Sequence, residues 1–260
     1  MSTIQSRTIV LLTGAYVSHH CWDDWKNYFI QKGYTTLAPP WPYKEQSAVV
    51  QRAKQPDKKL ASLTLAQLLD HYIRIINDLP EKPILIGHSF GGFLTQVLLN
   101  KGYGAAGIAI HSVPPKGVLP LEFSFYKSNA AALGLFSSAN TTYLRPFKSW
   151  QYAFTNGMTL EEQQRTYDAL VIPESRRAIR GALGNDGKVD FKKKHNPLLM
   201  LSGSEDQCIP ASLNYRNYKR YSNPQSVVEY VNKQGRNHFV LGLPTWKEDA
   251  DFILAWIAKQ

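Results

Sequence analysis

The stretch that decides the fold is residues 83–101, PILIGHSFGGFLTQVLLNK. A short apolar run at 84–86 leads into Gly87-His88-Ser89-Phe90-Gly91, and a helical pattern follows. This is a G-x-S-x-G sequence between a strand and a helix, the context in which the motif forms a sharp turn. A Cβ atom two residues before or after the serine would collide with the crossing chain, so glycine is needed at both positions.

The expected turn makes Ser89 a candidate nucleophile. It pushes the hydroxyl into the open and places the amide of Phe90 at a helix N-terminus, where developing negative charge is favoured. We expect His88 to turn away into packing. A Gly-rich turn in any doubly wound protein is the alternative interpretation of the motif alone. A serine is a poor nucleophile without a base within reach and an acid that orients the base, so the chain must supply both.

Length and composition are those of an ordinary globular protein. The chain has 260 residues, 43% hydrophobic and 19% charged, which is enough for one substantial core. It contains no apolar run of membrane-spanning length, and its start lacks the pattern of a secretory signal, so we expect a cytoplasmic location. Cys21 and Cys208 indicate no disulfide framework, and each is expected to be a small buried thiol.

The charge of the chain is strongly basic but dispersed. The formal net charge is +10, and the longest basic run is residues 192–194. No aromatic residues are interleaved with that run to stack bases, so we expect a solvated face and no nucleic-acid partner.

Apolar strand patterns alternate with helical patterns, which predicts a parallel sheet with right-handed crossovers. Strands are expected at residues 8–12, 34–38, 84–86, 106–110, 197–202 and 227–231. Residues 43–62 are polar and are expected to form a surface loop. The alternation lapses at about 116–195, where aromatic residues are frequent and a capping-box pattern at 159–162 predicts a helix to about residue 170.

With this organisation the chain resembles the α/β-hydrolase superfamily, in its serine esterase and lipase-like branch. The resemblance implies an α/β fold with a mostly parallel sheet flanked by helices. Its core would comprise residues 1–115 and 196–260, and residues 116–195 would be a mostly helical lid (cap) insertion. In this superfamily the catalytic residues follow in the order serine, acid, histidine.

The acid and base positions of the superfamily are both filled. Asp206 stands in a G-x-x-D turn after the strand at 197–202, and Glu205 is a distant second choice. His238 stands between the last strand and the last helix, where the base of the superfamily lies. The resemblance therefore implies a Ser89-Asp206-His238 triad.

The superfamily also needs two backbone donors for the oxyanion. Phe90 would supply one, and Ala15 or Tyr16, after the first strand, would supply the other. Many relatives carry His-Gly in that loop, whereas this chain has Thr13-Gly14, so the choice between the two stays open.

We therefore predict a serine hydrolase that cleaves carboxylic esters, or similar acyl substrates, through an acyl-enzyme intermediate. The aromatic-rich lid favours a small-molecule ester with an uncharged, fairly apolar acyl or alcohol part. We expect Tyr16, His111 and Phe239 to contact the substrate. No metal-ligand spacing, Walker pattern or dinucleotide fingerprint occurs, so we expect no metal site and no cofactor.

Other activities known on this fold remain alternatives. Perhydrolases form the same acyl-serine, and hydroxynitrile lyases keep the three residue types. Those lyases carry a lysine directly after the base histidine, where this chain has Phe239, which counts against cyanohydrin cleavage. Receptor-like relatives keep an intact triad mainly for binding. Ester hydrolysis remains the main prediction.

Overall fold

A six-stranded, entirely parallel sheet forms the centre of the molecule, seen here in a computed structural model that describes residues 4–260. Residues 1–3 lie outside the described residues. They belong to the N-terminal segment in which no secretory signal is expected. The strand order is β2-β1-β3-β4-β7-β8. The strands are β1 (Thr8–Leu12), β2 (Thr35–Leu37), β3 (Ile84–His88), β4 (Ala106–Ile110), β7 (Leu198–Gly203) and β8 (Val228–Lys233).

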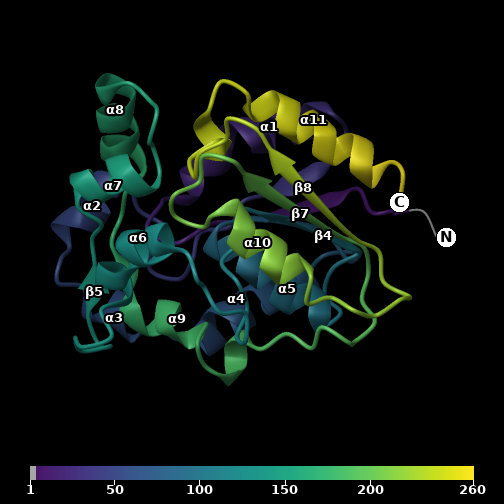
Figure 1. Ribbon diagram of the computed structural model, residues 1–260, viewed down its shortest axis with the longest axis horizontal. Coiled ribbons are helices and arrows are strands. Elements are labelled where there is room, and N and C mark those ends of the chain that lie inside the picture. The colour runs from purple at the N-terminus through teal and green to yellow at the C-terminus, as the bar shows by residue number, and fades with distance from the viewer. Residues whose placement is uncertain (1–3) are drawn as a thin grey trace.

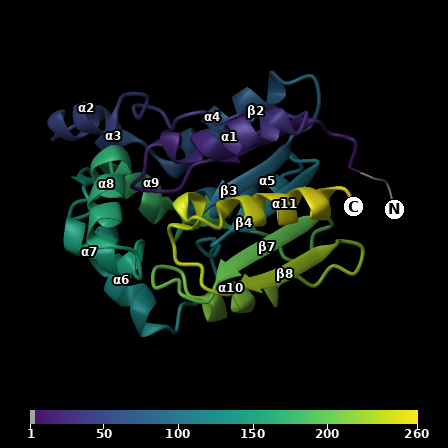
Figure 2. The ribbon, with the colours of Figure 1, turned by 90° about the horizontal axis from the view of Figure 1, so that it is seen from above.

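Helices cover both faces of this sheet, which is why its central strands are continuous apolar runs. Along β1, Ile9 and Leu11 pack into one core and Val10 and Leu12 into another, because successive strand residues face opposite sides. Helices α1 and α11 lie on one face, and α4, α5 and α10 lie on the other (Figures 1 and 2). These helices are α1 (Asp23–Gln31), α4 (Leu65–Asn77), α5 (Phe90–Asn100), α10 (Ala211–Tyr218) and α11 (Trp246–Ile257).

The register of the central strands aligns their carboxyl ends. His88, the last residue of β3, pairs with Ile110 of β4, and Ile110 pairs with Leu201 of β7. The loops that leave these strands therefore begin at one edge of the sheet, which is where ligands bind in open α/β sheets.

A helical region inserted between β4 and β7 lies beyond this edge (Figures 1 and 2). We call residues 116–195 the cap. Its helices are α6 (Phe123–Leu133), α7 (Phe147–Ala153), α8 (Leu160–Leu170) and α9 (Arg176–Gly181), with an antiparallel pair of short strands, β5 (Thr142–Tyr143) and β6 (Glu174–Ser175). The predicted capping box of α8 is present. Within residues 4–260, no helix is long and apolar enough to cross a membrane.

The prediction that residues 43–62 form a loop was wrong. Two short helices occupy this stretch, α2 (Ala48–Ala53) and α3 (Lys58–Ser62). Each begins at a capping side chain, Ser47 or Asp57, which accepts a hydrogen bond from the amide three residues on. Helix α2 contacts α8, and α3 contacts β6. Contacts with the cap therefore stabilise these two helices, which could not be predicted from their polar composition.

Candidate active site

Ser89 occupies a strained turn between β3 and α5. Its backbone has φ 57° and ψ −118°, outside the regions that non-glycine residues usually adopt. Two hydrogen bonds to the β4 side hold it there: Ser89 N donates to the carbonyl oxygen of Ile110 (2.9 Å), and Val113 N donates to that of Ser89 (3.1 Å). The sheet therefore fixes the conformation that directs the hydroxyl toward His238 Nε2.

The two glycines of the motif have the steric role expected from the sequence. A Cβ atom at Gly87 would lie 2.1 Å from the carbonyl oxygen of Gly91. One at Gly91 would lie 1.8 Å from the carbonyl oxygen of Leu12, at the end of β1. Neither distance is compatible with a side chain, so the tight turn depends on both glycines.

The structure brings together the three residues expected to form the triad. His238 Nε2 lies 2.9 Å from Ser89 Oγ, and His238 Nδ1 lies 2.7 Å from Asp206 Oδ2. Ser89 follows β3, Asp206 follows β7 and His238 follows β8, and all three are buried. The side chain of Glu205, the second choice for the acid, is exposed and bonded by Ser204 Oγ (3.1 Å).

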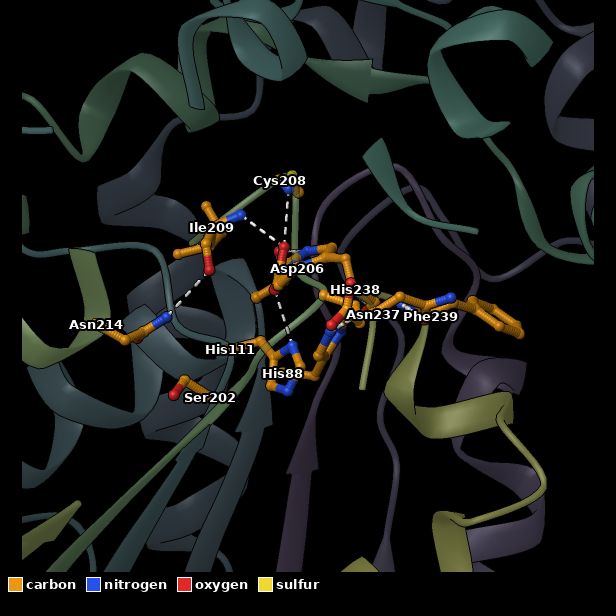
Figure 3. Close-up of polar contacts among 12 residues, drawn as sticks. His88, His111, Ser202, Asp206, Cys208, Ile209, Asn214, Asn237, His238 and Phe239 are labelled. Carbon is orange, nitrogen blue, oxygen red and sulfur yellow. Dashed lines mark hydrogen bonds and ion pairs between the residues drawn. The ribbon is translucent and has the colours of Figure 1, made fainter. Parts of the chain in front are cut away.

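Asp206 accepts four hydrogen bonds (Figure 3). Oδ1 accepts from the amides of Cys208 (2.8 Å) and Ile209 (2.7 Å), and Oδ2 accepts from Nδ1 of His238 and of His111 (2.8 Å). Burial by itself would raise the pKa of the Asp206 carboxyl, but the two histidines hold that pKa well below its ordinary value. Asp206 is therefore an ionised and rigidly held carboxylate.

This arrangement determines the tautomer of His238. Burial lowers the pKa of His238, but the Asp206 carboxylate outweighs burial and raises that pKa above its ordinary value. Because Nδ1 faces a carboxylate, it carries the proton, and Nε2 of the neutral ring accepts the hydrogen bond from Ser89. The neutral ring thus presents an unprotonated Nε2 to the Ser89 hydroxyl.

His88 and His111 have roles that the sequence did not predict. His88 does not simply pack away from the site: its Nε2 donates to the carbonyl oxygen of His238 (2.9 Å), which fixes the backbone of that residue. Burial and the nearby histidines hold the pKa of His88 well below its usual range, so it is neutral. His111 shares Asp206 Oδ2 with His238. The one signal for both was their position at the carboxyl end of a buried strand.

His111, Asp206 and His238 also bring three potential metal-ligand atoms within 4.8 Å of one another. Both histidines direct Nδ1 at the same carboxylate oxygen. The three side chains are thus joined to one another by hydrogen bonds.

A cavity of about 510 Å³ opens beside Ser89 and extends under the cap. Tyr16 and Phe90 line it next to the serine, and Phe125 and Ile179 line it from α6 and α9. The size suits a small-molecule ligand, and the wall is mainly apolar.

Of the three residues predicted to contact substrate, Tyr16 belongs to the cavity wall, whereas His111 and Phe239 do not belong to its described lining. His111 is buried behind Asp206. Phe239 is buried against Trp150, with ring centroids 5.5 Å apart. Contact of His111 and Phe239 with a substrate therefore stays a prediction.

The loop after β1 is tied to the cap. Tyr16 has φ 69°, and its amide donates to Glu174 Oε2 (3.3 Å). Glu174 also forms an ion pair with Lys44, and both side chains are buried. Ala15 lies in the cavity wall with Ser89 and Phe90. The amide of Tyr16 is thus engaged by the cap, whereas no such bond holds the amide of Ala15 within residues 4–260.

The model of the alpha/beta hydrolase family matches residues 9–247. The chain belongs to this family. The fold class expected from the sequence, with a parallel sheet and an inserted helical region, is confirmed. A search of curated proteins found no match.

Solved structures share this fold at low sequence identity. Polyneuridine aldehyde esterase is similar with a TM-score of 0.68 at 14% identity, over 96% of this chain and 99% of that one. Monoacylglycerol lipase from Paleococcus ferrophilus gives 0.69 at 15%, over 97% and 94%. An extracellular alpha/beta-hydrolase from a Paenibacillus species gives 0.65 at 19%, over 95% and 98%. At these identities the similarity shows the fold alone.

Proposed function

We propose that this hydrolase cleaves carboxylic esters with Ser89 as nucleophile, His238 as base and Asp206 as the acid that orients the base. The observation that carries the proposal is the continuous chain of contacts from Ser89 Oγ to His238 Nε2 (2.9 Å) and from His238 Nδ1 to Asp206 Oδ2 (2.7 Å). These are the distances that a nucleophile and its base require.

The reaction follows from this arrangement. His238 Nε2 takes the Ser89 proton as Oγ attacks the ester carbonyl, and the imidazolium then donates that proton to the departing alcohol. An acyl-serine remains. His238 next takes a proton from water as the water oxygen attacks the acyl carbon. The imidazolium then returns that proton to Ser89 Oγ as the acyl–oxygen bond breaks, which releases the acid and restores the serine.

The negative oxygen formed in each attack needs two donors. Phe90 N lies at the N-terminus of α5, where intrahelical partners are lacking and the helix dipole favours negative charge. We propose the amide of Ala15 as the second donor, since the amide of Tyr16 already donates to Glu174. Loss of one such donor typically slows turnover by about 10²–10³-fold.

A series of p-nitrophenyl esters from acetate to laurate tests the proposal. We expect release of nitrophenol that Ser89→Ala abolishes, with a loss of about 10⁴-fold or more. Ser222→Ala, which changes an exposed serine, is the matched control and should keep full activity. Absence of hydrolysis throughout the series, or equal rates for wild type and Ser89→Ala, would rule out the proposal.

A further inference from the structure

Arg145 is a completely buried cation in the wall of the cavity. Two of its Nη1 hydrogens reach neutral acceptors, the Ser128 carbonyl oxygen (2.8 Å) and Ser149 Oγ (2.8 Å). Nη2 makes one long contact with Asn129 Oδ1 (3.4 Å), and Nε has no hydrogen-bond partner. Among the ion pairs within residues 4–260, none includes Arg145.

A buried guanidinium without an anion is costly, because neutral acceptors replace only part of its hydration. The buried carboxylates of Glu174 and Asp206 are engaged by other residues. Glu174 is paired with Lys44, and Asp206 is bonded by two histidines and two amides. Within residues 4–260 the positive charge of Arg145 therefore has no anionic partner.

The guanidinium lies near the reacting groups. It is over the ring of Tyr16 (4.8 Å to the centroid) and over the ring of Phe154 (5.0 Å). Phe154 in turn packs edge-on against the His238 ring, with centroids 4.6 Å apart. One aromatic ring thus separates Arg145 from the proposed base, a distance that a short substrate can span.

We propose that Arg145 binds a carboxylate group of the substrate, so that the preferred esters are hemiesters of short dicarboxylic acids. Nε and Nη2 form the same edge of a guanidinium, and they are the nitrogens with donors to spare. That edge matches the two oxygens of a carboxylate. The inference rests on the proposed ester hydrolysis and replaces the uncharged substrate expected from the sequence with an anionic one that has an apolar spacer.

The test compares monomethyl glutarate with its neutral isostere, in which an amide replaces the free carboxylate, by measuring methanol release. Wild type should prefer the anion in kcat/KM by about 10- to 100-fold, the range for hydrogen bonds to charged groups. Arg145→Met should lose that preference, so that the anionic and neutral esters are cleaved with kcat/KM values within about threefold of each other. Arg145→Lys should keep part of it. Lys148→Met, which removes an exposed cation of α7 outside the described lining of the cavity, should keep all of it.

Binding separates this inference from the proposed function. Calorimetry with Ser89→Ala should detect glutarate, and the additional Arg145→Lys substitution should weaken binding; this holds even if Arg145→Met fails to fold. Hydrolysis of both esters without preference, together with no glutarate binding, would show that Arg145 only braces α6 against α7, and would leave ester hydrolysis standing. Glutarate binding with no Ser89-dependent hydrolysis would refute the hydrolase and support the anion site.

Discussion

Asp206→Asn tests whether the carboxylate dictates the protonation of His238. Oδ1 of Asp206 accepts two backbone amides, so the asparagine oxygen should keep that place and its NH₂ group should replace Oδ2. The NH₂ hydrogens would then face Nδ1 of His238 and of His111. To accept such a bond His238 must carry its proton on Nε2, where it can no longer take a proton from Ser89.

The expected cost is that of a base held in the wrong tautomer, about 10⁴-fold in kcat, or about 5 kcal/mol of activation free energy. KM should change little, because Asp206 does not belong to the described lining of the cavity. Steady-state kinetics on p-nitrophenyl butyrate measures both quantities, and thermal unfolding checks that the variant is folded.

Glu205→Gln is the matched control, since it removes the adjacent, exposed carboxylate. Its kcat should stay within about twofold of wild type, as expected for a surface change away from the site. A loss below about tenfold in Asp206→Asn, or an equal loss in Glu205→Gln, would refute the reasoning.

Three further predictions concern the base, the buried ion pair and the turn. Since the pKa of His238 is raised and only the neutral ring accepts a proton, kcat/KM should climb as pH rises through that pKa; a pH profile highest in acid would contradict this. Glu174→Gln leaves Lys44 buried without its anion, so denaturant unfolding should show a loss of about 3–5 kcal/mol, partly recovered when Lys44→Met is added; unchanged stability would mean that the pair is not formed. Gly91→Ala places a Cβ atom 1.8 Å from a β1 carbonyl oxygen and should lower the unfolding free energy by about 3 kcal/mol or more, and a fully stable variant would show that the turn is looser.

The residues that follow the buried strands could be predicted well from the sequence. Buried parallel strands are short apolar runs, so their ends can be located, and residues just beyond them must meet at one edge. Ser89, Asp206 and His238 follow three such strands, and the structure brings them together. The G-x-S-x-G spacing likewise predicted the steric role of Gly87 and Gly91.

What the sequence did not predict depends on how side chains meet across distant segments. His111 and Asp206 are far apart in the chain, and nothing local indicates that His111 shares an oxygen with His238. Helices α2 and α3 are too short and polar to show helical periodicity, and contacts with the cap support them. Nothing in the sequence around Arg145 indicates that its side chain is buried, because the rings that it contacts belong to Tyr16 and Phe154, which lie in other segments.

The central claim is that Ser89 is a nucleophile activated by His238. Intact-mass analysis after treatment with a fluorophosphonate, followed by peptide mapping, tests it without any knowledge of the substrate. We predict one adduct per chain, located on Ser89 and formed at least about 10³-fold more slowly in His238→Ala. Absence of labelling, an adduct on another residue, or labelling of Ser89 at the same rate without His238 would contradict the account.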